Sequence, residues 1–372
     1  MIGEKYTYPR ATKFKNSVKN ASLPMPAIIT HHQFAREMLN LPATSFIKSV
    51  QERNAFLLGS QGPDPLFFCV VSPSLSAYRA LGSLMHDKKP GKLLHVISGT
   101  PALAPSNMKK TVQAYCAGFL CHYLLDRAAH PFVYAQQFAL CNAGIDGLDE
   151  RDGHEVHAVI ESELDEMILY THEGLTISSF KPYKEILKAD EQSLAAISHA
   201  VCATLWETYE KLSPAHLFSA SVHNYRRVQF ATYSPRGIKR TLYGVVERRF
   251  KRHSFAQAFC HRPLALTESI FDNHEHRVWI DPFTNAKHTT SFEDIFNNAL
   301  EEANSLIPRF IGETIIESAS ETSFKSASKD ISQNASRKIS EAVCGNISEG
   351  ISLNEAEALA CNLNFSGKPY SS

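Results

Sequence analysis

The chain has 372 residues, of which 44% are hydrophobic and 20% are charged, the proportions of an ordinary water-soluble globular protein. Its 38 Lys and Arg residues balance 38 Asp and Glu residues, so the formal net charge is zero. This balance argues against nucleic acid as the main partner, because such affinity rests largely on neutralising phosphates. The longest purely apolar runs, such as residues 67–71, are far shorter than the roughly 20 residues of a membrane-spanning helix.

The N-terminal residues 1–24 are mildly basic and lack the apolar stretch of a secretory signal, so we expect a disordered leader there. The eight cysteines form no Cys-x-x-Cys motif and show no regular spacing. Several lie in apolar surroundings of helical pattern, where cysteine behaves as a small buried hydrophobic residue. Reduced thiols without a secretory signal predict a cytoplasmic protein.

Helical patterns dominate the chain from residue 31 to about 210, and strands and helices do not alternate. The sequence predicts helices over residues 33–40, 107–141, 152–171 and 183–211. Pro131 lacks a backbone donor, so we expect a kink or a stop there. The clearest strand signal covers residues 175–178. These patterns predict an all-α fold.

The second half of the chain contains a basic stretch and a serine-rich end. Residues 226–252 hold nine Lys and Arg residues against one acidic residue, Glu247. The stretch is either a solvated basic helix or loop, or a surface for anionic lipid or another polyanion. Residues 286–312 return to a helical pattern. We therefore expect a leader over 1–24, one domain over 25–312, and a helical or disordered serine-rich tail over 313–372.

Histidine is abundant, with 17 in the chain, and several stand at helical intervals from acidic residues. His122, Asp126 and His130 are four residues apart, so they form one stripe on a helix. The surrounding Tyr, Leu, Ala and Phe residues indicate burial, where a carboxylate must be paired or bind a metal. Taken alone, this stripe also fits an Asp–His hydrogen-bonded network that serves only the core.

A second stripe follows, because His154, His157 and Glu161 share one face of the next predicted helix. Imidazole nitrogen together with carboxylate oxygen is the ligand set expected for zinc. Further donors lie on separate segments, at His31, Asp64 and His86. This donor set is too large for one tetrahedral ion and suits two or three.

In this order the motifs resemble the zinc-dependent phospholipase C family, which shares its all-α fold with the S1/P1 nucleases. The resemblance is carried by Thr30-His31, the Gly62-Pro63-Asp64 turn, His86, His122-x3-Asp126 and His157-x3-Glu161. Residues 276–284 and 291–294 resemble a downstream segment of bacterial members. The resemblance spans about residues 25–305 and implies the multi-helix fold of this family.

The resemblance also implies a set of zinc ligands. It implies a first ion held by Asp64, His86, His122 and Asp126, and a second held by His130, His157 and Glu161. It implies a third ion held in part by His31, with Asp126 as a bridge. In this family Asp64 has also been assigned as the general base, so its role as ligand or base stays open.

Two features depart from the family pattern. Secreted members complete the third site with an N-terminal tryptophan, whereas the tryptophans here are Trp206 and Trp279. The interval from Asp126 to His130 is also shorter than in secreted members. Two other histidines are alternative ligands: His154 could replace His130, and His32 could replace His31.

The resemblance implies hydrolysis of a phospholipid headgroup or a related small phosphodiester by metal-activated water. One alternative is an all-α HD-type phosphohydrolase, because His86-Asp87 is an HD dipeptide. Another is a non-catalytic zinc-stabilised scaffold that binds a membrane or a partner. A zincin protease is excluded, because His154-Glu-Val-His157 is one residue short of the HExxH motif.

Overall fold

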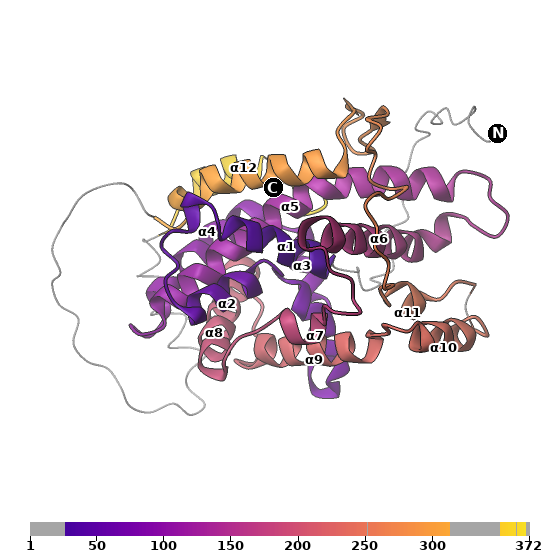
Figure 1. Ribbon diagram of the computed structural model, residues 1–372. Helices are drawn as coiled ribbons and strands as arrows, with labels where there is room; N and C mark the ends of the chain where they lie inside the picture. The colour runs from indigo at the N-terminus through magenta and orange to yellow at the C-terminus, as the bar shows by residue number, and fades with distance from the viewer. Residues whose placement is uncertain (1–26, 251, 313–349, 362, 370–372) are drawn as a thin grey trace.

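The computed structural model describes residues 27–250, 252–312, 350–361 and 363–369. Most of these residues are helical, which confirms the prediction of an all-α fold. The longest helix, α5 (Lys109–Cys141), lies among the other helices (Figure 1). It packs against α1 (Ile28–Met38), α2 (Val50–Gly59), α4 (Pro90–Gly99), α6 (Gly153–Glu173), α8 (Glu191–Tyr209) and α12 (Phe292–Phe310).

Shorter elements surround this group of helices. The remaining α-helices are α3 (Leu81–Asp87), α7 (Pro182–Glu185), α9 (Leu217–Thr232), α10 (Ile238–Glu247), α11 (Phe255–Ala258) and α14 (Leu353–Ala360). The 3-10 helices are η1 (Pro42–Thr44), η2 (Asp64–Val71), η3 (Pro73–Tyr78), η4 (Thr100–Leu103) and η5 (Glu150–Asp152). Within the described residues, the strands form a single antiparallel pair, β1 (Trp279–Ile280) and β2 (Lys287–His288).

The strand prediction was wrong, and of the two outcomes expected at Pro131 the stop does not occur. Helix α5 continues through Pro131, and the residues that follow, Phe132 and Val133, are buried in the core. Residues 175–178 form a turn after α6 instead of a strand, and the amide of Phe180 closes it onto the carbonyl of Thr176 at 2.8 Å. Burial of Ile177 beneath the turn accounts for its apolar character.

Helices α2 and α5 approach each other through two glycines. A Cβ atom on Gly59 would lie 2.1 Å from the carbonyl oxygen of Tyr115, and one on Gly118 would lie 2.1 Å from that of Phe56. Only glycine permits backbones this close. Because α2 ends at this contact, the turn that follows it begins beside the N-terminal half of α5.

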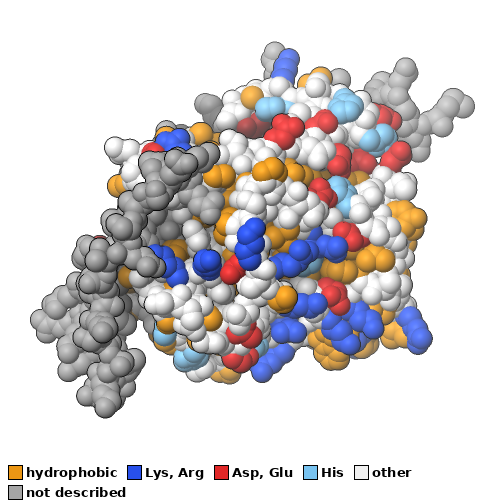
Figure 2. All heavy atoms as spheres, turned by 60° about the vertical axis from the view of Figure 1, so that its left-hand side comes forward, with side chains coloured by type: hydrophobic (Ala, Val, Ile, Leu, Met, Phe, Trp, Pro, Cys, Tyr) orange, Lys and Arg blue, Asp and Glu red, His pale blue; other side chains and the backbone are white. Residues whose placement is uncertain are grey.

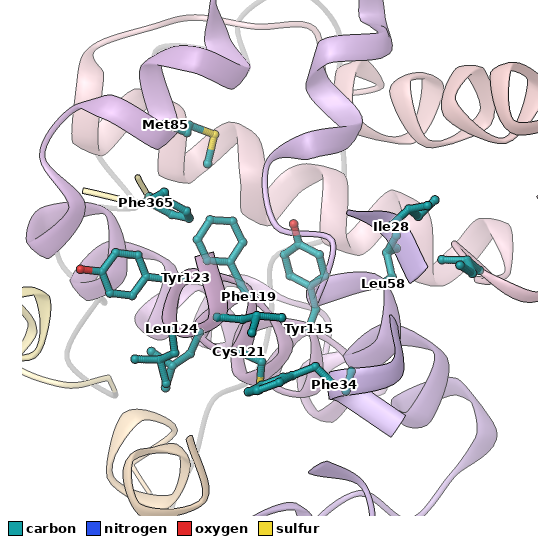
Figure 3. Packing of buried hydrophobic residues seen from close by; sticks show 14 of the residues in the cluster. Ile28, Phe34, Leu58, Met85, Tyr115, Phe119, Cys121, Tyr123, Leu124 and Phe365 are labelled. Carbon is teal, nitrogen blue, oxygen red and sulfur yellow. The ribbon is translucent and has the colours of Figure 1, made fainter. Parts of the chain in front are cut away.

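The apolar core lies around the middle of α5 (Figure 3). Phe34, Tyr115, Phe119 and Tyr123 are fully buried there and come from α1 and α5. Phe365 joins them from far along the chain, and its ring lies 4.9 Å from that of Tyr123, edge to face. The core therefore includes a residue that the sequence assigns to a tail.

Residues 350–361 and 363–369 form a C-terminal segment that packs into the domain. Its helix α14 lies against α4, and Tyr123 donates its hydroxyl to the carbonyls of Ala360 and Leu363. Arg127 donates to the carbonyl of Leu359 at 2.8 Å. The expected leader and residues 313–349 of the expected tail lie outside the described residues.

Candidate metal centre

The first element of the site is α1, which is held by a buried carboxylate on α6. Asp165 accepts hydrogen bonds from the amides of Ile29 and Thr30, at 3.1 and 2.7 Å, and from the hydroxyl of Thr30 at 2.6 Å. Its second oxygen also accepts from Nε2 of His261 at 2.9 Å. These bonds occupy backbone donors at the start of α1 and hold the next residue, His31, over α5.

The turn after α2 supplies the second element. Gly62 has a φ of +50°, a conformation that favours glycine, and a Cβ there would lie 2.1 Å from the His122 ring. The Gly62-Pro63 turn leads directly into η2, which begins at Asp64. The side chain of Gln61 donates to the carbonyl of Ile28 at 3.2 Å and ties this turn to α1.

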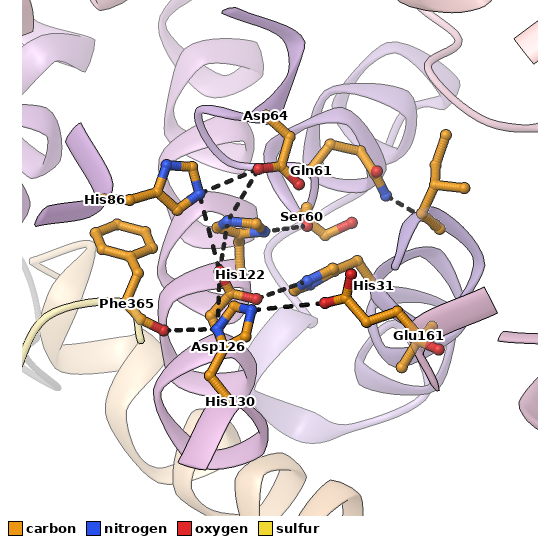
Figure 4. Close-up of polar contacts among 12 residues, drawn as sticks. His31, Ser60, Gln61, Asp64, His86, His122, Asp126, His130, Glu161 and Phe365 are labelled. Carbon is orange, nitrogen blue, oxygen red and sulfur yellow. Dashed lines mark hydrogen bonds and ion pairs between the residues drawn. The ribbon is translucent and has the colours of Figure 1, made fainter. Parts of the chain in front are cut away.

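The first cluster of donors gathers around Asp126 on α5 (Figure 4). Oδ2 of Asp126 lies 3.2 Å from Nε2 of His122 and 3.9 Å from Nε2 of His86, while Oδ1 lies 2.9 Å from Nε2 of His31. Oδ1 of Asp64 lies 3.1 Å from Nε2 of His86 and 4.0 Å from that of His122. Asp126 therefore touches imidazoles from three separate elements, the position of a bridging carboxylate.

The second cluster joins α5 to α6. Oε1 of Glu161 lies 3.2 Å from Nε2 of His157 and 3.6 Å from Nε2 of His130. The rings of His130 and His157 are stacked, with centroids 5.6 Å apart. Nδ1 of His130 also lies 3.8 Å from Asp126, so the two clusters adjoin.

Four of the imidazoles are oriented in the same way by carbonyl oxygens behind them. Nδ1 of His86 contacts the carbonyl of Gly82, and Nδ1 of His122 contacts that of Ser60. Nδ1 of His130 contacts the carbonyl of Phe365, and Nδ1 of His157 contacts the side-chain carbonyl of Gln137. A carbonyl only accepts, so each Nδ1 carries a proton, and Nε2 is the ring atom left to bind a metal ion or a second proton. All four Nε2 atoms face the carboxylates, the arrangement found around metal-ligating histidines.

The donor set fits metal ions. Tetrahedral zinc ligands at about 2.0–2.1 Å from the ion lie about 3.3 Å from one another, and the contacts above range from 2.9 to 4.0 Å. Several buried donor atoms have no hydrogen-bond partner, namely Nε2 of His122, Nδ1 of His31 and Oε2 of Glu161. A cavity of about 20 Å³ borders His31, Asp126, His130 and Glu161, room for roughly one small ion or water.

The electrostatics of the centre also favour a cation. Burial opposes ionisation of Asp126, yet the imidazoles of His122 and His130 outweigh it and hold its pKa well below the usual range. Burial likewise opposes protonation of His130, but the charge of Asp126 and the bond to Glu161 raise its pKa to about 9. Buried carboxylates in so small a volume require positive charge, which protons or metal ions can supply.

The structure brings together all eight predicted ligands and excludes both reserve residues. Three groups could each hold a metal ion: His31, His122 and Asp126; Asp64, His86 and His122; and His130, His157 and Glu161. His154 is exposed on the outer side of α6 and belongs to none of them. His32 is buried beside Phe180, where burial lowers its pKa to about 3.

The HD dipeptide is not assembled as a metal site. His86 faces the cluster, but the neighbouring Asp87 is exposed at the end of α3 and accepts a bond from Asn364 at 3.5 Å. Among the described residues, Asp87 belongs to none of the groups that could hold a metal ion, so the dipeptide contributes one donor only.

Sequence reasoning missed the residues that support the ligands. Asp165 lies at i+4 from Glu161 on α6 and reads as an ordinary buried acid, while His261 lies 96 residues further on. Only the i+4 spacing of Asp165 gave a signal. Phe365 and Gln137 act through carbonyl oxygens, and a backbone carbonyl leaves no mark in a sequence.

No protein-family model matches the sequence, and neither a curated protein nor a solved structure matches it. Among the described helices, none combines the length and the apolarity required to cross a bilayer. The seven cysteines in the described residues are all unpaired.

Proposed function

We propose that the protein is a zinc-dependent phosphodiesterase of the phospholipase C type. The observation that carries the proposal is the common orientation of four imidazoles, each fixed by a carbonyl at Nδ1 and aimed through Nε2 at buried carboxylates. A core hydrogen-bond network would satisfy its own donors and acceptors. Here Nε2 of His122 and Oε2 of Glu161 are buried without partners.

The donor set matches zinc, since imidazole nitrogen and carboxylate oxygen suit this ion and thiolate is absent from the three groups. Two ions would be held by the groups around Asp64 and Glu161, and a third by the group that contains His31. When bound, such ions supply a hydroxide at neutral pH and positive charge for the oxygens of an in-line displacement at phosphorus.

Two residues have distinct roles in this proposal. Asp126 faces three imidazoles with its two oxygens, so it would bridge ions in the first cluster. Asp64 turns Oδ1 toward His86 and His122, which favours a ligand over a free general base.

Substrate would reach the centre at its accessible edge. The side chains of His86, His130 and His157 are 13%, 16% and 10% exposed, whereas His122 is fully buried. We propose a phosphodiester as substrate, either a phospholipid headgroup or a related small molecule. Its negative phosphate suits a centre whose charge becomes positive once the ions are bound.

Metal analysis and a turnover assay on one preparation test the proposal. We expect two or three zinc ions per chain, and hydrolysis of bis-p-nitrophenyl phosphate or p-nitrophenylphosphorylcholine that stops with chelator and returns with zinc. The scaffold alternative predicts a different result: chelator lowers the melting temperature, yet no diester is cleaved with zinc bound. That result would reject the proposed enzymatic activity and leave the proposed metal centre supported. A chain that binds no zinc would reject both.

A further inference from the structure

Helix α10 turns its apolar side chains outward. Ile238 is 69% exposed, Leu242 57% and Val245 56%, and Phe250, in the turn that follows the helix, is 86% exposed. The three helical residues follow a spacing of i, i+4 and i+7 and so share one face. Together with Arg236 and Thr241 they line a shallow groove. A surface helix ordinarily turns such a stripe to the core, so this one is reversed.

The opposite face of α10 is the one that packs. A Cβ on Gly244 would lie 2.7 Å from the side chain of Gln257 on α11, so these helices are in close contact. Tyr243 donates its hydroxyl to the carbonyl of Ala231, which ties α10 to α9. The exposed apolar side chains therefore contribute little to holding the helix in place.

Basic side chains flank the apolar stripe. Arg236 precedes α10, Arg248 and Arg249 follow it, and all three are exposed. The single acid of this stretch, Glu247, is turned inward and accepts bonds from the hydroxyl of Ser254 and the amide of Ala256. Figure 2 shows Lys and Arg side chains gathered with hydrophobic ones in the lower part of the molecule, where Figure 1 places α9 and α10.

We infer that α10 and its flanking arginines bind the surface of an anionic phospholipid bilayer, with the stripe of Ile238, Leu242 and Val245 and the nearby Phe250 inserted among the headgroups. Exposed apolar side chains beside Lys and Arg are the features of helices that lie in a membrane interface. The inference goes beyond the proposed function, because none of these residues belongs to the metal centre. Binding through α10 would hold the protein at a surface whose lipids are phosphodiesters.

Two other partners fit this surface less well. Nucleic acid would use the arginines but leave the apolar stripe of α10 and Phe250 exposed, since phosphate contacts are electrostatic. A second copy related by a two-fold axis would bring the arginines at the ends of α10, Arg236, Arg248 and Arg249, against arginines of its partner, which like-charge repulsion opposes.

Vesicle sedimentation tests the inference. The full chain is mixed with vesicles of phosphatidylcholine alone or with added phosphatidylglycerol, and hydrolysis of soluble bis-p-nitrophenyl phosphate is measured separately. We expect binding to the anionic vesicles that weakens with salt. Leu242→Asp and the pair Arg248→Glu with Arg249→Glu should each weaken binding about tenfold or more. Ile270→Asp, at a residue 85% exposed outside α10, is the matched control and should bind as the parent does.

The outcomes separate this inference from the proposed function. Lost vesicle binding with unchanged hydrolysis of the soluble diester and an unchanged melting temperature supports a membrane surface at α10. Parent-like binding by Leu242→Asp would overturn it, as would equal loss in Ile270→Asp. Absence of vesicle binding by the parent would also overturn it, and two further results would then name the partner. Dimerisation that Leu242→Asp abolishes indicates a second copy, and duplex DNA binding that only the arginine variant loses indicates nucleic acid.

Discussion

His130 donates its Nδ1 proton to the backbone carbonyl of Phe365 at 2.9 Å, although 235 positions separate the two residues. The Phe365 ring also lies 5.0 Å from the ring of His86 and 5.7 Å from that of His122. One residue of the C-terminal segment thus orients one histidine of the second cluster and covers two of the first. The candidate metal centre depends on a part of the chain that contributes none of its donors.

Phe365→Ala should weaken both clusters. The change leaves a cavity in the core, which costs about 3–5 kcal/mol of the free energy of unfolding, and loosens the carbonyl behind His130. Loss of such support lowers metal affinity about 10- to 100-fold, measurable by competition with a zinc chelator. Phe365→Leu keeps the segment docked and should retain most of the affinity. Parent-like affinity in the alanine variant would contradict the role of the segment.

Asp126→Asn should abolish hydrolysis and lower the zinc content. In asparagine an amide nitrogen replaces one carboxylate oxygen, and it can neither accept a hydrogen bond from an imidazole nor bridge two ions. The first cluster, which includes His31 and His122, therefore loses its shared ligand. Elemental analysis and the diester assay measure the two effects. Asp146→Asn, at an exposed acid in the loop after α5, is the matched control. Full zinc occupancy with normal turnover in Asp126→Asn would reject the bridging role.

Asp165→Asn should displace α1 and affect the first cluster alone. The neutral amide keeps fewer of the four bonds to Ile29, Thr30 and His261, which costs about 2–3 kcal/mol of the free energy of unfolding. We expect partial loss of zinc, because His130, His157 and Glu161 do not touch this carboxylate. Equal zinc loss from all groups would indicate general unfolding, which a melting curve measured in parallel would reveal.

Gly62→Ala should push the His122 ring out of the first cluster. The new Cβ would overlap the ring, and the backbone would also be strained at its φ of +50°. Gly174→Ala separates the two effects, because Gly174 has a φ of +65° with nothing within 4 Å of its Cβ position. Both variants should lose about 1 kcal/mol of stability from backbone strain. Only Gly62→Ala should lose zinc and activity, and equal behaviour of the two would contradict the overlap.

His172 lowers the stability of the folded state as the pH becomes alkaline. Hydrogen bonds to Glu293 and Glu37 raise its pKa to about 10, so the folded state binds a proton that the unfolded chain releases near its ordinary pKa of 6.5. The stabilisation is complete below pH 6.5 and disappears as the pH rises through about 10. His172→Gln should therefore destabilise by about 1–2 kcal/mol near neutral pH and by less above pH 10. Urea unfolding across this range measures the difference, with His199→Gln, at an exposed position on α8, as control.

Helical spacing allowed the sequence to predict which donor side chains of α5 and α6 come together. His122, Asp126 and His130 had to share one face of α5, and His157 and Glu161 one face of α6, whatever the rest of the fold. The hydrogen bonds that orient these ligands were not predictable, because they join residues that no periodicity connects. Ser60 and Gly82 act through carbonyls that every residue possesses.

Local rules failed where tertiary packing outweighed them. Pro131 has no backbone donor, yet the buried side chains beside it keep α5 continuous. The serine-rich composition of residues 313–372 concealed the apolar contacts of Phe365 and Ala360, which are fully buried. The outward-facing apolar stripe of α10 was not predicted either, since the sequence showed the basic charge of this stretch but not which face of the helix packs.

The order of synthesis delays completion of the centre. A ribosome makes α1, α5 and α6 before it makes Phe365, so these helices can assemble while the His130 ring still lacks its carbonyl partner. A nascent chain at this stage would bind metal weakly. Docking of residues 363–369 would then convert a loose donor set into a rigid one.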